Sequence, residues 1–218
     1  MFLIYCRHQT PVALDPDWVS SSFSDIKKPF IIDVGCAKGS WALHYAAANP
    51  DHNVLGLEIR GPMVDLAIER AKESKLSNIR YLACNANVDM YRILEDLTKL
   101  SSEIRLVAMQ FPDPCFKKKH KKRRLINTLF LNTIAGFLKE NSEIFFQSDV
   151  DDLSISTVEL IESSSYFSPC DGYLSASMLT NPNPTGIPTE REISVLKRNL
   201  NVYRMLFRRN SNLIPIIK

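Results

Sequence analysis

The segment from Phe111 to Arg124 holds the residues best suited to chemistry. It reads FPDPCFKKKHKKRR, so Asp113 stands between two prolines, and seven Lys or Arg residues and one His follow without an acid among them. Proline fixes φ and biases the preceding residue toward extended backbone, so this turn presents one carboxylate on a stiff support. A carboxylate can hold a base edge, and a basic run can hold a nucleic-acid backbone. The pairing indicates chemistry on a nucleobase.

The positive charge of this chain is local. The formal net charge is +3 over 218 residues, and the basic run contributes seven positive charges, so the rest of the chain is acidic on balance. A local cluster favours contact with nucleic acid or phosphate over a generally basic surface. A solvated surface segment and a nuclear-localisation signal are the alternative interpretations of the run.

The elements that must position these residues follow from the apolar pattern. Strands are predicted at 28–34, 53–59, 78–84, 104–111 and 142–147. Helices are predicted at 40–49, from 61 to about 76, and at 89–100, 125–139 and 150–165. This alternation predicts an α/β chain with a parallel sheet and helices on both faces, and ligands then bind beyond the carboxyl ends of the strands. The residues at or just past those ends are Gly35, Glu58, Asn85, Asp113 and Asp149.

The C-terminal part has a different pattern. Residues 181–188 are rich in turn-forming Asn, Pro and Gly, and Thr189 and Glu192 have the spacing of a helix capping box. A last strand is predicted at 202–207. Neither an internal repeat nor a long linker is visible, so we expect one domain over residues 1–218, with an N-terminal arm at 1–27 and a tail at 209–218.

The turn after the first predicted strand suits a nucleotide-like cofactor. It reads DVGCAKG from Asp33 to Gly39, and Glu58 at the end of the second strand is placed to accept hydrogen bonds from ribose hydroxyls. The dinucleotide fingerprint G-x-G-x-x-G is absent, and Asp33 would repel a pyrophosphate but could pair with the ammonium of a methionine moiety. S-adenosylmethionine is therefore favoured over a dinucleotide. A glycine turn that merely packs a helix on the sheet is the alternative without a ligand.

The cysteines predict neither disulfides nor zinc. Five are scattered without a C-x-x-C pair, which indicates reduced thiols in a reducing compartment and no metal site. No apolar run approaches membrane-spanning length, and the apolar start at residues 1–5 is too short for a signal-peptide core.

Taken together, these motifs resemble those of the tRNA (guanine-N7-)-methyltransferases. The resemblance extends from about residue 28 to residue 208, and its specific element is the Pro-Asp-Pro turn followed by Lys117, His120, Arg123 and Arg124. The other matching elements are DVGCAKG at 33–39, GLE at 56–58, CNAN at 84–87, SD at 148–149 and TERE at 189–192. The resemblance implies a class I Rossmann-like methyltransferase fold, with a mostly parallel sheet and an antiparallel C-terminal strand.

The resemblance also implies transfer of a methyl group from S-adenosylmethionine to N7 of a guanine in the variable loop of tRNA. By position, the residues implied at the cofactor are Asp33, Gly35, Gly39, Glu58, Asn85, Ala86, Asn87 and Asp113, and Asp113 is also the candidate catalytic residue. Those implied at the tRNA substrate are Lys117, Lys118, Lys119, His120, Lys121, Lys122, Arg123, Arg124, Asp149, Thr189, Glu190, Arg191 and Glu192.

Three residues depart from the family pattern. Ala37 stands where many relatives have glycine, Asn85 where many have aspartate, and Cys115 where an aromatic residue is common. The Cys-Ala-Lys segment at 36–38 and the Asn-Ala-Asn segment at 85–87 resemble the cyanobacterial and plastid branch. We expect a soluble protein of the cytoplasm or of a plastid or mitochondrion. We expect no membrane and no metal among its partners. A monomer, a homodimer and a complex with a partner subunit remain open.

Guanine N7 carries a free lone pair and no proton, so its methylation needs alignment rather than a general base. We expect Asp113, with Asp149, Thr189 and Glu192, to accept hydrogen bonds from N1–H and the 2-amino group of a guanine that has left its stack. A methyltransferase acting on an exocyclic amine of RNA or DNA and a non-catalytic RNA-binding relative are the competing functions. Asp113 as a turn residue, Asp149 as a helix cap, and Thr189 with Glu192 as a capping box alone are the structural alternatives.

Overall fold

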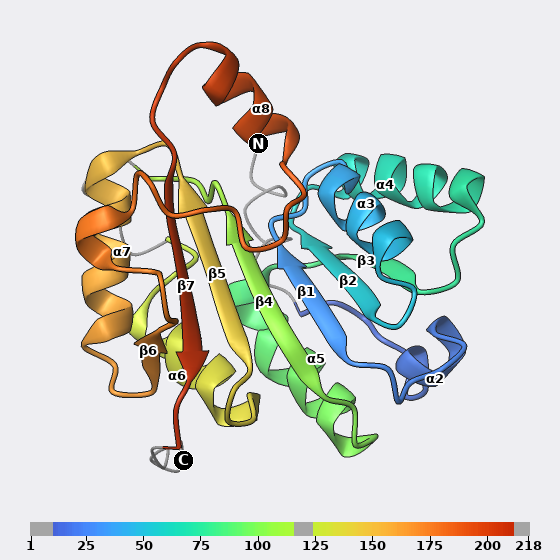
Figure 1. The fold of residues 1–218 in the computed structure, drawn as a ribbon. Coiled ribbons are helices and arrows are strands. Elements are labelled where there is room, and N and C mark those ends of the chain that lie inside the picture. Colours follow the sequence, from blue (N-terminus) through green and yellow to red (C-terminus); the bar gives the residue numbers. More distant parts are fainter. Residues whose placement is uncertain (1–10, 116–123, 212–218) are drawn as a thin grey trace, which may run out of the picture. The chain divides into compact units, whose positions relative to one another are not determined.

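The computed structural model describes residues 11–115 and 124–211. The chain divides into two compact units, residues 1–104 and 105–218, and each is described by itself. The expected single domain over residues 1–218 stays a prediction. Figure 1 labels the elements of both units.

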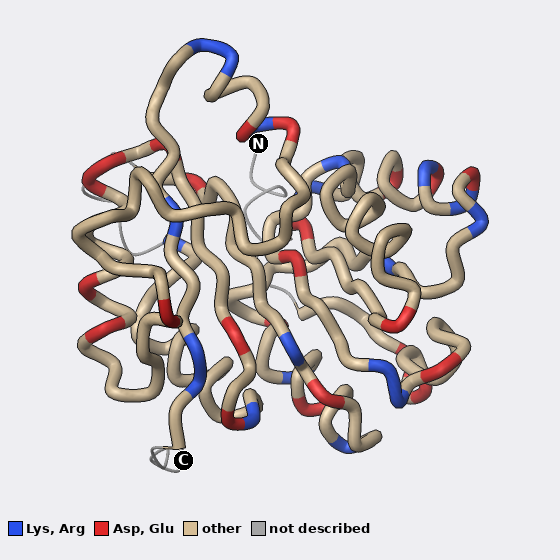
Figure 2. The backbone as a smooth tube through the Cα atoms, in the orientation of Figure 1, with Lys and Arg blue, Asp and Glu red and all other residues tan. Residues whose placement is uncertain are grey.

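The first unit is built on three parallel strands. They lie in the order β3-β2-β1, and their bounds are β1 Phe30–Val34, β2 Asn53–Glu58 and β3 Ile79–Ala83. The helices of this unit are α2 Trp18–Ser22, α3 Ser40–Ala48, α4 Gly61–Ser74 and α5 Ala86–Lys99. Every residue of β1 and β2 is buried, which is the pattern of strands covered on both faces. Charged residues of both signs lie along α4, whose buried residues Val64 and Ala67 form its inner side (Figure 2).

Residues that precede the first strand are held against α5. The backbone N–H of Val12 donates to Asp89 Oδ1 at 2.8 Å, and Arg92 donates to the carbonyl of Val12 at 3.1 Å. Further along, the indole of Trp18 donates to Asp96 Oδ2 at 2.9 Å. Three polar side chains of one helix, Asp89, Arg92 and Asp96, therefore position the approach to β1.

The described residues of the second unit form four strands of mixed direction. Its strands are β4 Ile104–Gln110, β5 Glu143–Ser148, β6 Phe167–Pro169 and β7 Tyr203–Arg209. β4 and β5 are parallel, whereas β7 runs antiparallel to both β5 and β6. The remaining elements are α6 Thr128–Phe137, α7 Asp151–Glu162, the short 3-10 helix η2 Ser175–Ser177 and α8 Glu190–Lys197. The expected antiparallel C-terminal strand is confirmed.

The predicted strands and helices are all present, with small shifts at their ends. α5 begins at Ala86 rather than at residue 89, because the side chain of Asn85 caps it by accepting from the backbone N–H of Asn87. α6 begins at Thr128 rather than at residue 125, because Asn127 caps it in the same way. The helix α2 and the edge strand β6 were not predicted from the pattern. Both are short, so neither completes a clear hydrophobic period.

Tyr81 on β3 requires two glycines in the first unit. Its hydroxyl donates to the carbonyl of Gly39 at 2.8 Å, and its ring lies across Gly56, its register partner on β2. A Cβ at Gly56 would lie 2.4 Å from Tyr81 Cδ1 and 2.9 Å from Cys36 Sγ. These distances are shorter than carbon atoms tolerate, so only glycine fits beneath the ring.

No helix among residues 11–115 and 124–211 has the length and apolar character needed to cross a membrane.

We expect Gly56→Ala to lower the free energy of unfolding by about 1–3 kcal/mol, because the added methyl overpacks the space under the Tyr81 ring. The matched control is Gly61→Ala at the start of α4, where a Cβ meets nothing within 4 Å. That change should stay within about 0.5 kcal/mol of wild type. Urea unfolding of the three proteins measures both values, and equal stability of the two variants would contradict the packing argument.

Candidate active site

The turn after β1 adopts left-handed backbone at three positions. Gly35, Ala37 and Gly39 have φ values of +85°, +49° and +72°. The N–H groups of Gly35 and Cys36 both donate to the carbonyl of Leu57 on β2, at 2.7 and 3.0 Å, which anchors the turn to the neighbouring strand. Alanine at +49° carries the steric cost of a Cβ in this region. A Cβ at Gly35 would meet nothing within 4 Å, so open space lies beside the backbone of the turn.

Two acids flank this turn at the ends of neighbouring parallel strands. Asp33 is the fourth residue of β1, Glu58 is the last residue of β2, and both side chains are buried. The backbone N–H of Ala37, within the turn, donates to Glu58 Oε2 at 3.1 Å. The predicted grouping of Asp33, Gly35, Gly39 and Glu58 at one edge of this unit is therefore present.

Arg60 also donates hydrogen bonds to the carboxylate of Glu58. The backbone N–H and the Nε of Arg60 donate to Oε1, both at 2.9 Å, and its Nη2 donates to Oε2 at 3.1 Å. With the N–H of Ala37, these bonds fill the roughly four acceptor positions of a carboxylate. Burial raises the pKa of Glu58, but the hydrogen bonds from Arg60 outweigh it and leave this pKa below its ordinary value. Glu58 is thus held as an anion whose carboxylate oxygens already accept hydrogen bonds from Arg60 and Ala37.

The third predicted cofactor segment opens a helix. Asn85 is the N-cap of α5, and Ala86 and Asn87 form its first turn. The backbone N–H of Asn85 donates to Asp89 Oδ2 at 3.0 Å, so the buried Asp89 fastens this corner as well as the N-terminal segment. The side-chain oxygen of Asn85 therefore caps α5, and any contact of Asn85 with the cofactor must leave room for that bond.

The thiols of the first unit are chemically quiet. Cys36 and Cys84 are buried, and none of the four described cysteines (Cys36, Cys84, Cys115 and Cys170) forms a disulfide. Cys6 lies outside the described residues. Burial raises the pKa of Cys84 to about 12, and burial with Asp33 and Glu58 nearby raises that of Cys36 further. Neither thiol is ionised near neutral pH. Among the described residues, no group of three or more His, Cys, Asp or Glu side chains is arranged to hold a metal ion.

In the second unit, the turn after β4 presents Asp113. The N–H of Phe111 donates to the carbonyl of Gln147 on β5 at 2.7 Å, and Phe111 then turns the chain with a φ of +51°. Asp113 is exposed, and its Oδ1 accepts from the backbone N–H of Cys115 at 2.8 Å. The turn-aspartate interpretation is therefore correct for one carboxylate oxygen. That bond orients the exposed carboxyl group on the turn.

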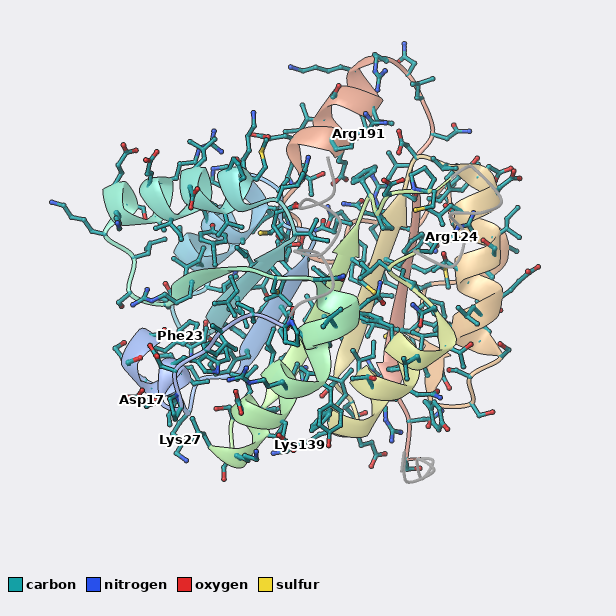
Figure 3. The ribbon with its side chains drawn as sticks, turned by 180° about the vertical axis from the view of Figure 1, so that it is seen from behind. Asp17, Phe23, Lys27, Arg124, Lys139 and Arg191 are labelled. Carbon is teal, nitrogen blue, oxygen red and sulfur yellow. The ribbon has the colours of Figure 1, made fainter. Side chains whose placement is uncertain are left out.

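The basic run that follows is anchored at its end by Arg124. Its Nε donates to the carbonyl of Pro114 and its Nη1 to Ser156 Oγ on α7, both at 3.1 Å. Figure 3 shows Arg124 beside α7. Arg124 therefore ties the turn that carries Asp113 to α7. The predicted RNA-binding residues Lys117, Lys118, Lys119, His120, Lys121, Lys122 and Arg123 lie outside the described residues.

Asp149 pairs with Arg191 and does not cap α7. Arg191 Nη2 donates to Asp149 Oδ2 at 2.5 Å, and Figure 3 shows Arg191 on α8. The N-cap position of α7 belongs to Val150, whose N–H donates to Ser148 Oγ at 3.1 Å. The helix-cap interpretation of Asp149 is therefore wrong, and the ion pair connects two of the predicted substrate residues.

The predicted capping box at α8 is present. Glu192 N–H donates to Thr189 Oγ1 at 3.0 Å, and Thr189 N–H donates to Glu192 Oε2 at 3.3 Å. Glu190 and Arg191 between them are exposed, whereas the Glu192 side chain is only 3% exposed. The structure thus separates this motif into two outward side chains and one carboxylate inside the protein.

The hydrogen-bond partners of the buried acids Glu58 and Glu192 were not predicted from the sequence. Arg60 is two residues beyond Glu58, so the E-x-R spacing was a usable signal. Arg204 donates from β7 to Glu192 Oε1 at 2.8 Å, and Gln147 donates from β5 to Oε2 at 3.1 Å. Those contacts join residues far apart in the chain, and no local pattern indicates them.

We expect Arg60→Met to raise the pKa of Glu58, because burial then meets less opposition from hydrogen bonds. Because the pKa of Glu58 is lower in the folded than in the unfolded protein, the ionised carboxylate stabilises the fold at pH values above the unfolded pKa of 4.5. This stabilisation is lost as the pH falls through the folded pKa. The stability gap between wild type and variant should therefore be present at pH 6 and shrink on acidification through roughly pH 4.5 and below. Carboxyl NMR titration and urea unfolding across this range measure both effects. Lys99→Met, which breaks an exposed pair with Glu95, is the control, and an unmoved Glu58 pKa would contradict the expectation.

This chain is similar to known methyltransferases over most of its length. A family model described as putative methyltransferase matches residues 27–205. A tRNA (guanine-N(7)-)-methyltransferase of Prochlorococcus marinus (strain NATL2A) is 41% identical over 184 residues, which is 84% of each chain. One of Synechococcus elongatus is 40% identical over 193 residues, or 88% of this chain and 86% of that protein.

Solved structures show the same fold at low identity. The 16S rRNA methyltransferase KamB superposes with a TM-score of 0.61 at 14% identity, covering 91% of this chain and 95% of its own. An antibiotic-related methyltransferase gives 0.55 at 16% identity, covering 95% and 98%. The fold is the class I Rossmann-like methyltransferase fold. With about 40% identity to curated relatives across most of its length, the chain belongs to the tRNA (guanine-N7-)-methyltransferase family.

Proposed function

We infer that this chain transfers a methyl group from S-adenosylmethionine to N7 of a guanine in tRNA, and we propose the variable loop as its target. The observation that carries the chemistry is the exposed carboxylate of Asp113. It is oriented by its own turn, placed just past the end of β4 and followed directly by the basic run. The relatives named above support the reaction and the substrate class.

The residues at the end of β1 and β2 fit S-adenosylmethionine. The open space beside Gly35 lets a ligand approach the backbone, and the buried acids Asp33 and Glu58 suit an ammonium and a ribose. We propose Gly39, Asn85, Ala86, Asn87 and Asp113 as the further cofactor residues. S-adenosylmethionine, when bound, supplies an electrophilic methyl group. Because Arg60 fills the acceptor positions of Glu58, ribose hydroxyls can bond this carboxylate only where the Arg60 side chain gives way.

On the substrate side, the protein must orient guanine rather than deprotonate it. N7 has a lone pair and no proton, so the enzyme accelerates methyl transfer by aligning N7 with the methyl group. We propose that Asp113 accepts hydrogen bonds from the guanine N1–H or 2-amino group, and that its negative charge also stabilises the positive charge that the ring gains. Asp149, Thr189, Glu190 and Arg191 are proposed to hold the substrate nucleotide. The Asp149–Arg191 ion pair keeps a cation beside this group, which suits an adjacent phosphate.

The basic run is proposed to bind the tRNA backbone without reading sequence. Phosphate contacts of this kind position a nucleic acid and are salt-dependent. Arg124 is proposed to contribute by anchoring the run as well as by its charge, since its guanidinium is held by Pro114 and Ser156. We further propose that both units form one catalytic domain. The four described cysteines form no disulfide, which suits a reducing compartment, either the cytoplasm or an organelle.

We expect the purified protein, incubated with unmodified tRNA transcript and labelled S-adenosylmethionine, to form 7-methylguanosine on nucleoside mass analysis. Asp113→Ala should lower turnover by roughly a hundredfold or more, because the oriented carboxylate is lost. Its fold should persist, since the side chain is exposed. Asp171→Ala, another exposed aspartate of the second unit, is the control and should retain wild-type turnover. Wild-type-like turnover in Asp113→Ala would remove Asp113 from the mechanism, and methylation at an exocyclic amine would overturn the proposed reaction.

Replacing Lys117, Lys118 and Lys119 by glutamine should weaken tRNA binding and flatten its salt dependence. Each phosphate contact contributes about 0.7–0.9 to the slope of log K against log salt, so losing three should reduce the slope by about 2–3. Filter binding at several salt concentrations measures it. The control variant carries the same change at Lys27, Lys72 and Lys75, which are exposed in the first unit. An unchanged slope in the first variant would mean that these lysines do not touch phosphate.

A further inference from the structure

A row of polar side chains crosses three strands of the second unit where the proposed substrate turns begin. Gln110 on β4 is the register partner of Gln147 on β5, and Gln147 is the register partner of Arg204 on β7. Register partners in a sheet project from the same face, so the three side chains lie next to one another. Glu192 of α8 bonds to this row, and Gln110, Gln147, Arg204 and Glu192 are together called the polar row.

Hydrogen bonds connect the polar row from end to end. Gln147 Nε2 donates to Gln110 Oε1 at 2.8 Å and to Glu192 Oε2 at 3.1 Å, which uses both of its N–H groups. Arg204 Nη2 donates to Glu192 Oε1 at 2.8 Å. Glu192 also accepts from Asn183 Nδ2, at 3.0 Å for Oε2, and from the N–H of Thr189 at 3.3 Å. Its carboxylate is therefore filled by groups of the protein itself.

The polar row is costly to bury. Gln147 is 0% exposed and Glu192 3% exposed. Three of the row's buried atoms, Gln110 Nε2, Gln147 Oε1 and Arg204 Nε, make no hydrogen bond within the part of the chain that the structure describes. Buried polar atoms without partners destabilise a fold, and apolar side chains of similar volume would often serve its stability as well or better. Stability alone therefore does not account for the polar row.

The position of the polar row between the proposed substrate segments explains why these polar groups are buried. Gln110 immediately precedes the turn of Phe111 and Asp113, and Gln147 lies two residues before Asp149. Through Asn183 and the capping box, Glu192 also holds the loop that leads into α8. Arg204 donates in addition to the carbonyl of Asn181 at 3.3 Å. The polar row is thus the connection between the ends of β4 and β5 and the Thr189–Glu192 motif.

We propose that Glu192 is a positioning residue that acts through Gln147, Gln110 and Arg204, rather than a ligand of the guanine. The polar row sets the relative placement of the turn that carries Asp113, the residue pair Ser148–Asp149 and the start of α8. This inference rests on the proposed function, because those three segments are the proposed substrate residues of the second unit. It also reassigns one residue of the substrate set that the family resemblance implies.

Gln147→Met and Glu192→Gln test the proposal, because methionine keeps the volume of glutamine and glutamine that of glutamate. We expect each to lower kcat by roughly tenfold or more, since misplaced reacting groups slow the aligned step. The KM for tRNA and the Kd for S-adenosylmethionine should stay within about threefold of wild type, because neither residue touches a ligand. The double variant should be about as slow as the slower single variant, because both changes break one network.

The matched control is Glu143→Gln. Glu143 pairs with Arg208 at 3.6 Å on the same two strands, but at the opposite end of β5 from the substrate turns. Its kcat should stay within about twofold of wild type. Arg204→Lys, which keeps a cationic donor toward Glu192, should retain more activity than Arg204→Met.

A readout independent of activity separates this proposal from the proposed reaction. The backbone N–H groups of Phe111 and Cys115 are hydrogen-bonded at the turn. Their hydrogen exchange should speed up in Gln147→Met and Glu192→Gln but not in Glu143→Gln. An inactive wild-type protein would end the proposed reaction, yet the exchange comparison would still decide whether the polar row holds the turn.

A wild-type kcat in Gln147→Met beside a large loss in Glu192→Gln would overturn the proposal, because Glu192 would then act on the substrate directly. Unchanged exchange at Phe111 and Cys115 in both variants would overturn it too. If Gln147→Met does not fold, Gln110→Met serves for the same comparison, because it breaks a single hydrogen bond of the polar row. A wild-type kcat and unchanged hydrogen exchange in Gln110→Met would contradict the proposal.

Discussion

The buried carboxylates of this protein must each be held by donors from their own surroundings, and that constraint shapes both units. A charge removed from water is tolerated only when it is paired and hydrogen-bonded. Glu58 meets the requirement with Arg60 and the N–H of Ala37, and Glu192 meets it with Arg204 and its neighbours. In each case the bonds that satisfy the acid also tie a loop to the end of a strand. The same hydrogen bonds therefore satisfy the buried charges and position the residues of the proposed site.

The two acids differ in how easily their partners can be replaced. The partner of Glu58 is an arginine whose side chain is 57% exposed, and it lies only two residues away in the chain. Two partners of Glu192, Gln147 on β5 and Arg204 on β7, lie inside the protein and are themselves bonded to further groups. A ligand can compete with the first set by displacing one exposed side chain, whereas access to the second would require several strands to be disturbed. A binding role suits Glu58, and a positioning role suits Glu192.

Sequence alone predicted the strand and helix order and the identity of the polar residues at strand ends, because both depend on local periodicity and on the geometry of parallel strands. The capping box at Thr189 was also readable, since its two bonds join residues three apart. The caps at Asn85 and Asn127 were missed, although their residue type was a signal. The polar row could not be predicted, because Gln110, Gln147 and Arg204 meet only through strand register. Register is a property of the folded sheet that no short segment encodes.

Backbone strain gives an independent indication of where function is concentrated. Eight described residues other than glycine have positive φ. Four of them (Lys75, Ser101, Ser165 and Asn199) lie shortly after a helix, where left-handed residues are common, and Asn141 lies in the turn that leads into β5, where asparagine tolerates this backbone. The other three are Ala37, Phe111 and Cys115, which lie in the turns after β1 and β4. A left-handed residue with a Cβ costs about 1–2 kcal/mol, and such outliers persist where the surrounding structure holds them. The turn after β1 is held by Leu57 and Glu58, and the turn after β4 by Gln147 and Arg124. Among the described residues, left-handed backbone that neither follows a helix nor falls on asparagine is thus confined to the two turns that carry the proposed cofactor and catalytic residues.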